Sequence, residues 1–299
     1  MKTILRLCLL LLIVFGLDLA IDRLLLHGIH HYYGLNEPSE MLLLGHSQLM
    51  LAADKERMEN ELGLKISKYT QEGVDMTTRK VMAQHYLSFP SSDSLRYVLY
   101  GVDQFMFNPK GLSAKAYKLF YPFLDNRIID RYIRTECSSR SDYWAHKLIR
   151  TTRYSDLLLN ASIRGWLGNW SNLKYGTEDI EELQLNIAEG NMRQIAFDSL
   201  LMADFLSTID LFTAKGIRVI LIRTPVIDLL NDYQPDAYKQ ISEWLEQLAE
   251  RSPLIDLWDI NSQMEHDHTL FFDPIHLNPE GQQRSTELLV ERFKHSFAQ

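Results

Sequence analysis

Three side chains in two distant loops are of the types that turn a hydroxyl group into a nucleophile. Ser47 follows a short apolar run at residues 41–44, and Asp273 and His276 stand three residues apart near the other end of the chain. A serine hydroxyl attacks poorly until a base removes its proton, and imidazole suits that task near neutral pH. A carboxylate three residues before an imidazole can accept a hydrogen bond from one ring nitrogen while the other faces a cleft. The residues therefore predict acyl transfer through Ser47, with His276 as the base and Asp273 orienting it.

The same chemistry needs hydrogen-bond donors for the oxyanion that forms on the substrate. The candidate donors are the backbone N–H groups of Ser47 and Gly73, together with the side chains of Asp103 and Gln104. An ionised Asp103 would repel an oxyanion, so Gln104, a protonated Asp103 or the backbone alone would have to serve. Loss of one donor costs on the order of 3 kcal/mol of barrier, which predicts weak or specialised activity rather than none. Taken singly, Ser47 could simply cap a helix and Gly73 could be a plain turn residue.

Periodicity places these residues in an α/β framework. Five short segments predict strands: an apolar run at residues 41–44, an alternating segment at 65–70, and further segments at 95–100, 217–222 and 253–259. Helical patterns lie between and after them, at residues 49–64, 76–87, 191–214, 236–250 and 279–295. This alternation predicts a parallel sheet with right-handed crossovers. Since parallel strands end at one edge, the loops that carry Ser47, Asp273 and His276 are expected to meet there.

Residues 108–189 interrupt this rhythm with a long stretch rich in aromatic and basic residues. We expect a mainly helical insertion over the sheet edge. It could act as a lid, a sugar-stacking wall or a docking surface for a membrane or partner, or its aromatic residues could form the core of a packed subdomain. Because aromatic stripes usually pack, the core interpretation is favoured for most of them.

The amino terminus carries a targeting signal. Lys2 and Arg6 precede an uninterrupted apolar run at residues 7–17, which ends at Asp18. A positive start followed by such a run predicts a signal anchor within residues 1–25, with the rest of the chain outside the cytoplasmic membrane, in the periplasm. A group of His and Tyr side chains follows, and we expect it at the membrane interface rather than around a metal: His27, His30, His31, Tyr32 and Tyr33.

Composition narrows the class of partner. The chain has 299 residues, of which 46% are hydrophobic and 23% charged, and this suits a folded domain with a sizeable core. A net charge of -8 without a basic stripe argues against nucleic acid. Residues 265–268 form an acidic and histidine-rich group, but a clear third and fourth ligand are missing, so neither a metal nor another cofactor is expected.

Taken together, the motifs resemble those of the SGNH (GDSL-like) hydrolase superfamily. Gly45-His46-Ser47 stands where that family has Gly-Asp-Ser, Gly73 matches the glycine of its second block, and residues 273–276 match its Asp-x-x-His block. Two departures are His46 in place of an aspartate, and Gly101-Val102-Asp103-Gln104 in place of Gly-x-Asn-Asp. The resemblance covers roughly residues 40–105 and 190–295. It implies a three-layer α/β/α, flavodoxin-like fold over residues 40–299, interrupted by the insertion at about 108–189.

The layout is also similar to membrane-anchored members of that superfamily that act in teichoic-acid D-alanyl transfer and polysaccharide O-acetylation. The resemblance implies a serine esterase or O-acyltransferase that uses an acylated cell-envelope glycan or a small ester as substrate. A polytopic membrane acyltransferase is a possible partner. The alternative is an anchored binding or assembly protein that kept the fold and lost the chemistry, and Asp103 and the aromatic insertion motivate it.

Overall fold

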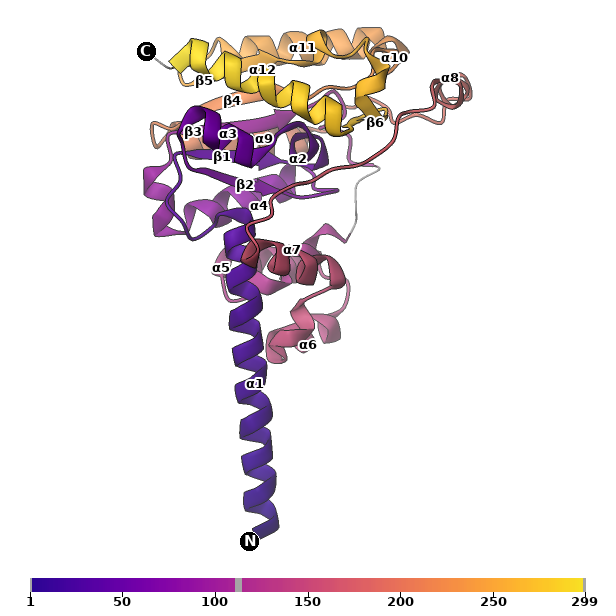
Figure 1. Cartoon of the computed structure of the whole chain (residues 1–299). Helices are drawn as coiled ribbons and strands as arrows, with labels where there is room; N and C mark the ends of the chain where they lie inside the picture. The colour runs from indigo at the N-terminus through magenta and orange to yellow at the C-terminus, as the bar shows by residue number, and fades with distance from the viewer. Residues whose placement is uncertain (1, 111–114, 298–299) are drawn as a thin grey trace. The chain divides into compact units, whose positions relative to one another are not determined.

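The computed structural model describes residues 2–110 and 115–297 (Figure 1). The chain forms two compact units. The first, here called the anchor unit, contains residues 1–36 and 114–169; the second, the sheet unit, contains residues 37–113 and 170–299. The residues that the sequence selects for chemistry all belong to the sheet unit.

A five-stranded parallel sheet organises the sheet unit. Its strands are β1 (Met41–Gly45), β2 (Ile66–Thr70), β3 (Tyr97–Val102), β4 (Arg218–Arg223) and β5 (Ile255–Asp259). They lie in the order β2-β1-β3-β4-β5, with Gly45 beside Thr70 and Leu44 beside Tyr100. The chain therefore leaves β1 toward β2 on one side and returns to β3 on the other, and ligands of open α/β sheets bind at such a switch point. The predicted α/β class and parallel sheet are confirmed.

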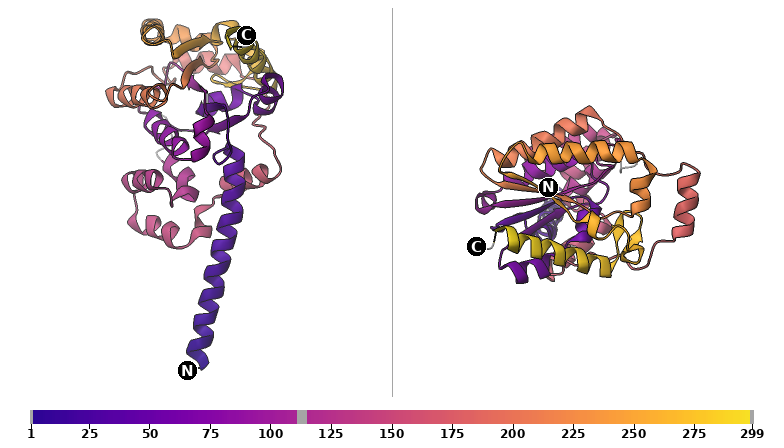
Figure 2. Two further views of the ribbon diagram at one scale, coloured as in Figure 1. Left: turned by 90° about the vertical axis from the view of Figure 1, so that its left-hand side faces the viewer. Right: turned by 90° about the horizontal axis from the view of Figure 1, so that it is seen from above.

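Helices flank these strands in the sheet unit, and in the view from above α11 and α12 lie on opposite sides of them (Figure 2). The helices are α2 (Ser47–Ala52), α3 (Lys55–Leu62), α4 (Met76–Leu87), α8 (Ile180–Ala188), α9 (Ser199–Thr213), α10 (Asp228–Tyr233), α11 (Pro235–Ala249) and α12 (Pro279–Phe297). The helix expected at 49–64 is divided, because Asp54 caps α3 by accepting a hydrogen bond from Arg57 N. The helix expected from residue 191 begins at Ser199, where Asp198 caps it in the same way.

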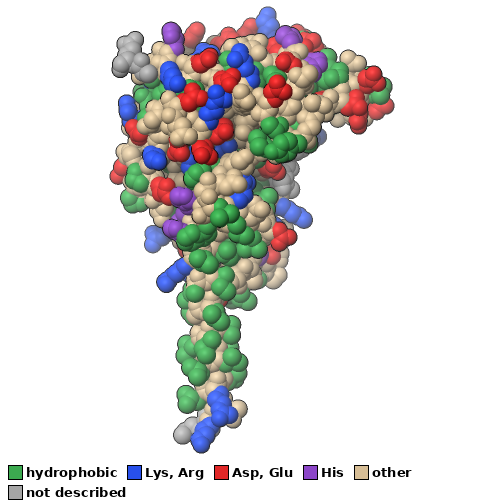
Figure 3. Space-filling model, viewed as in Figure 1, with side chains coloured by type: hydrophobic (Ala, Val, Ile, Leu, Met, Phe, Trp, Pro, Cys, Tyr) green, Lys and Arg blue, Asp and Glu red, His purple; other side chains and the backbone are tan. Residues whose placement is uncertain are grey.

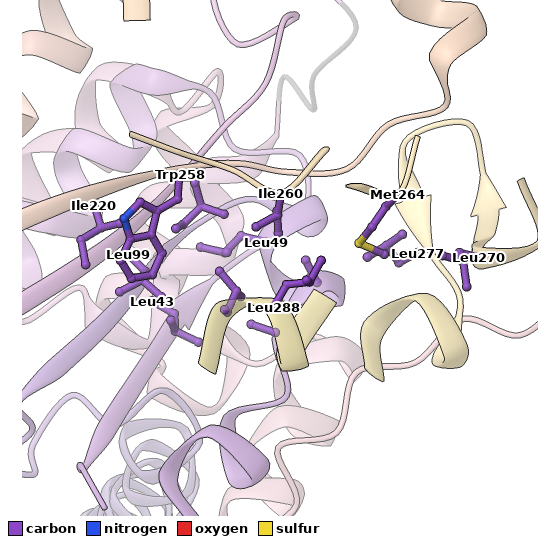
Figure 4. Packing of buried hydrophobic residues seen from close by; sticks show 14 of the residues in the cluster. Leu43, Leu49, Leu99, Ile220, Trp258, Ile260, Met264, Leu270, Leu277 and Leu288 are labelled. Atoms are coloured by element: carbon purple, nitrogen blue, oxygen red, sulfur yellow. The ribbon is translucent and has the colours of Figure 1, made fainter. Parts of the chain in front are cut away.

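Apolar side chains from the strands and flanking helices form a continuous core (Figure 4). Leu43, Leu99 and Ile220 of the sheet are fully buried, as is Leu49 of α2. Trp258 of β5 is 3% exposed and belongs to the same cluster. Burial of both faces explains why a central strand such as β1 reads as an unbroken apolar run rather than as an alternating pattern.

The anchor unit is built around one long helix, α1 (Lys2–Tyr33). The other members are η2 (Ala116–Phe123), α5 (Arg127–Glu136), α6 (Arg140–Leu148), η3 (Arg150–Arg153) and α7 (Asp156–Trp166). α1 and α7 cross at Gly28 and Gly165, where a Cβ on Gly165 would overlap the Gly28 carbonyl oxygen. The helical character of the insertion is as predicted, but its residues 114–169 group with α1, whereas α8 belongs to the sheet unit.

The first half of α1 is apolar and exposed, and the green surface in Figure 3 marks it. By length and composition α1 could cross a membrane, a test that a signal sequence also passes. Its second half is part of a folded core, in which Tyr32 is 9% exposed and Tyr33 is 4% exposed. The expectation that these tyrosines belong to a membrane-interface belt is therefore wrong, because both side chains are buried.

Candidate active site

Ser47 lies at the carboxyl end of a central strand. β1 ends at Gly45, His46 is extended, and α2 begins at Ser47. The turn therefore brings the serine out of the sheet at the edge where all five strands end. Ser47 is partly exposed, whereas both neighbours, His46 and Gln48, are buried. Ser47 therefore remains in contact with solvent, while its buried neighbours fix the backbone on both sides of it.

Asp273 and His276 face each other across a small hairpin. β6 (Phe271–Asp273) pairs antiparallel with β7 (His276–Leu277), and the register sets Asp273 opposite His276. Pro274 and Ile275 form the connection, and Ile275 N donates to Asp273 Oδ1 at 3.1 Å. The three-residue spacing noticed in the sequence is thus the spacing of a tight hairpin pair.

The structure brings Ser47, His276 and Asp273 into one hydrogen-bonded chain. His276 Nε2 lies 2.7 Å from Ser47 Oγ. His276 Nδ1 lies 2.7 Å from Asp273 Oδ2 and 2.9 Å from Oδ1. Burial tends to raise the pKa of Asp273, but the hydrogen bond and charge of His276 outweigh it, so that pKa lies below its ordinary value. An ionised Asp273 accepts the Nδ1 proton, which leaves the Nε2 lone pair facing the serine hydroxyl.

Asn278 and Gly281 hold the hairpin against the start of α12. Asn278 Oδ1 accepts from Gly281 N at 3.0 Å, and Asn278 Nδ2 donates to Thr269 O at 2.7 Å. A Cβ at position 281 would overlap the Leu270 carbonyl oxygen, so the close approach requires glycine. The position of the His276 ring therefore depends on contacts outside the hairpin itself.

A second histidine–aspartate pair lies buried directly behind Ser47. His46 Nε2 is 2.8 Å from Asp103 Oδ2, and Asp103 Oδ1 accepts from Phe105 N at 2.7 Å. Burial, reinforced by the charge of Arg79, lowers the pKa of His46 to about 4. Burial would raise the pKa of Asp103, but His46, Arg79 and Arg193 together lower it to about 2. At neutral pH His46 is neutral and Asp103 is ionised.

These contacts change the interpretation of Asp103 and Gln104. An ionised Asp103 has no proton to give an oxyanion, so the option of a protonated Asp103 does not fit the structure. Its carboxylate is instead occupied by His46 and the Phe105 N–H. Gln104 Nε2 donates to Asn231 Oδ1 at 3.0 Å, which uses one of the two N–H groups of its amide. The side chains of residues 103 and 104 support the loop after β3.

Gly73 lies in the loop after β2, the strand that pairs with β1. Its φ of 68° is in the left-handed region that favours glycine. Gln71 N, two residues earlier, donates to Gly45 O at 3.2 Å, so this loop begins beside the segment that carries Ser47. The Gly73 loop is thus at the same edge of the sheet as the hydrogen-bonded chain.

Arg79 is a contributor that the sequence did not reveal. It is 1% exposed, and its guanidinium donates to Val74 O at 3.3 Å and to Gly101 O at 3.0 Å. One buried cation therefore ties the loop after β2 to the end of β3, close enough to His46 and Asp103 to shift their pKa values. Its place in a polar helical segment gave no signal, because only the fold shows which face of α4 meets the sheet.

Glu178 adds a negative charge beside the candidate site. Its backbone N–H donates to Phe271 O at 3.0 Å, next to the strand that ends in Asp273. Burial, together with the nearby charges of Asp273, Glu182 and Asp179, raises the pKa of Glu178 to about 7. Its charge therefore changes across neutral pH.

The histidines of residues 265–268 share one carboxylate. His266 Nδ1 lies 2.6 Å from Asp228 Oδ2, and His268 Nε2 lies 2.8 Å from Asp228 Oδ1. Among residues 2–110 and 115–297, no group of three or more His, Cys, Asp or Glu side chains has a metal-binding arrangement.

Among comparisons with known proteins, one family model matches the part of the chain that carries Asp273 and His276. The model of an uncharacterised family matches residues 176–298, a segment that includes the Asp273–His276 hairpin but not Ser47. No curated protein matches the chain.

Proposed function

We propose that the protein is a serine esterase or O-acyltransferase with an SGNH-type, three-layer α/β/α and flavodoxin-like catalytic domain. The strand order β2-β1-β3-β4-β5 and the placement of Ser47 after β1 support this proposal. The single observation that carries it is the 2.7 Å approach of His276 Nε2 to Ser47 Oγ, across 229 residues of chain.

In this mechanism Ser47 Oγ attacks the carbonyl carbon of an ester while His276 Nε2 takes its proton. Asp273 stabilises the imidazolium that forms and holds the ring in place. The backbone N–H groups of Ser47 and Gly73 are the proposed donors to the oxyanion. Collapse of the tetrahedral intermediate passes the proton from Nε2 to the leaving alcohol and leaves an acyl group on Ser47. Water or a second hydroxyl then removes the acyl group by the same steps in reverse order.

The proposed place of action is outside the cytoplasmic membrane, on acyl esters of a cell-envelope polysaccharide. Lys2 and Arg6 before the exposed apolar half of α1 support an orientation with the amino terminus in the cytoplasm. The sheet unit follows the helix and would then be periplasmic.

A fluorophosphonate probe tests the proposal, since it forms a stable bond with an activated serine. The full-length protein in detergent is expected to be labelled, Ser47→Ala to be unlabelled, and Ser199→Ala, an exposed serine of α9, to be labelled like the wild type. An unlabelled wild-type protein, or equal labelling of Ser47→Ala, would contradict the proposal. The first outcome would favour a membrane-anchored binding or assembly protein.

A further inference from the structure

Part of the anchor unit exposes large apolar side chains on α6. Trp144 is 54% exposed, Leu148 is 67% exposed and Ile149 is 52% exposed. Trp144 and Leu148 are one helical turn apart and share a face, and Ile149 follows directly. The neighbouring Tyr143 is buried, so α6 has an inner face that packs and an outer apolar face. We call the exposed residues 144, 148 and 149 the α6 patch.

Hydrogen bonds fix the α6 patch at one level of α1. Arg150 N donates to Asp18 Oδ2 at 2.9 Å, and Thr151 donates to Asp18 Oδ1 from its backbone at 2.9 Å and from its hydroxyl at 2.7 Å. Ile149 precedes Arg150 in the chain. The patch therefore ends, along the chain, directly before the two residues that bind Asp18 of α1.

The uninterrupted apolar run at residues 7–17 is shorter than a bilayer core, so a spanning α1 must also place the residues on either side of that run in the membrane. Residues 7–17 rise by about 16 Å as a helix, whereas a hydrocarbon core is about 30 Å thick and needs about 20 residues. Exposed Ile21 and Leu24 continue the apolar surface beyond Asp18. A helix that spans the bilayer must therefore sink past residue 18, which brings the α6 patch to the lipid.

The acidic residues at that depth already have partners from the same unit. Asp18 is held by Arg150 and Thr151, as described above. Asp22 is 2% exposed, and it accepts from Arg150 Nη1 at 3.0 Å and from the Tyr154 hydroxyl at 2.8 Å. Carboxylates that are hydrogen-bonded and paired inside the protein reduce the penalty for approaching lipid.

Basic side chains accompany the patch. Arg134 and Arg140 line an open pocket together with Cys137, Ser139, Tyr143 and Trp144. A tryptophan beside arginines is typical of the membrane interface, where the ring lies among lipid headgroups and the cations attract their phosphates.

We propose that the α6 patch inserts into the interfacial layer of the bilayer that α1 crosses, as a second lipid contact of the anchor unit. The proposal rests on the membrane-anchoring part of the proposed function and is independent of the acyl chemistry. Two contacts with one bilayer restrict rotation of the anchor unit about the α1 axis, which a single helix would allow. The ligand class is a phospholipid surface.

Spin labels on the full-length protein in vesicles of phosphatidylethanolamine and phosphatidylglycerol test this proposal. Both natural cysteines, Cys8 and Cys137, are first replaced by serine, and single cysteines are then introduced by Leu148→Cys, Leu11→Cys and Leu200→Cys. Leu11 lies in the apolar run of α1, and Leu200 is an equally exposed leucine of α9 in the sheet unit. Collision rates with oxygen, which enriches in lipid, and with a water-soluble nickel complex report the depth of each label.

The oxygen-to-nickel ratio at position 148 is expected to rise well above that at 200 and toward that at 11. A ratio at 148 equal to that at 200, with a high ratio at 11, would overturn the proposal while leaving the anchor intact. Protection of the label at 148 from both reagents would also overturn it, and would indicate a protein partner or a second copy on the patch. A low oxygen-to-nickel ratio at position 11 would show that α1 does not lie in the bilayer, and it would overturn this proposal as well. Fluorophosphonate labelling of the same samples reports separately on Ser47.

Discussion

Replacement of Asp273 by asparagine tests whether the hydrogen-bonded chain acts through the tautomer of His276. Asp273 Oδ1 accepts from Ile275 N at 3.1 Å, and an asparagine keeps that bond by placing its own Oδ1 there. Its Nδ2 then takes the place of Oδ2, the atom 2.7 Å from His276 Nδ1. An amide N–H donates, so Nδ1 must accept, and the imidazole proton moves to Nε2. Nε2 then faces Ser47 Oγ with a proton and cannot act as the base.

The expected loss is large because the geometry is otherwise kept. The same change in a serine–histidine–aspartate triad lowers the rate by about 10⁴-fold, which corresponds to about 5.5 kcal/mol of barrier. The assay is the second-order rate of fluorophosphonate labelling of the full-length protein. Asp210→Asn, at an exposed position of α9, is the matched control and should label at the wild-type rate. Labelling of Asp273→Asn within about twofold of the wild type, with Ser47→Ala unlabelled, would refute the orienting role.

Three further predictions concern stability and pH. The pKa of His46 is about 4 in the folded state, against an ordinary value of 6.5. Between pH 6.5 and pH 4 the native protein therefore binds fewer protons than the unfolded chain, and it loses up to about 3 kcal/mol of stability as the pH falls through this range. Thermal unfolding at pH 7 and pH 4.5 measures this loss. The dependence on Glu178 has the opposite sign: its folded pKa of about 7 exceeds its ordinary 4.5, so its contribution to stability falls as the pH rises from 4.5 to 7. Glu178→Gln should therefore raise Tm above pH 7, because it removes a partly buried negative charge that Asp273 also repels. Gly281→Ala should lower the free energy of unfolding by about 1–3 kcal/mol and slow the labelling of Ser47, because its Cβ overlaps Leu270 O and displaces the hairpin.

Each of these has a measurement that would contradict it. If His46→Gln unfolded with the same pH dependence as the wild type, the acid-labile group would lie elsewhere. If Glu178→Gln changed Tm equally at pH 4 and pH 8, the effect would not come from its ionisation. Gly16→Ala, where a Cβ meets nothing within 4 Å, is the control for the glycine experiment, and equal behaviour of the two alanine variants would exclude steric overlap at position 281.

The sheet and its edge were predictable because their signals are local. Short apolar or alternating segments located the five strands, and the carboxyl-end rule placed the loops of Ser47 and His276 at one edge. The helix boundaries were less predictable. The pattern at residues 49–64 predicts one continuous helix. In the structure a new helix starts inside this segment, because the Asp54 side chain accepts a hydrogen bond from the backbone and caps α3.

The electrostatics behind Ser47 depended on contacts between distant segments. Arg79 is buried because α4 turns it toward the loop after β2 and the end of β3, and no periodicity marks that face. His46 and Asp103 become partners only when β1 and β3 lie side by side. Tyr32 and Tyr33 were misplaced for a related reason, since their burial depends on how the end of α1 packs against segments distant in the sequence.

Placing Asp273 and His276 opposite each other on one short hairpin separates two requirements of the site. The contact between carboxylate and imidazole is local to residues 271–277, whereas the contact with Ser47 joins two parts of the chain. A displacement of the hairpin as a rigid piece would break the bond to the serine and preserve the bond to the aspartate. The Nδ1–H resonance of His276 in proton NMR would then persist in a protein whose Ser47 no longer reacts. That resonance therefore reports only the Asp273–His276 contact, whereas the reactivity of Ser47 reports the complete site.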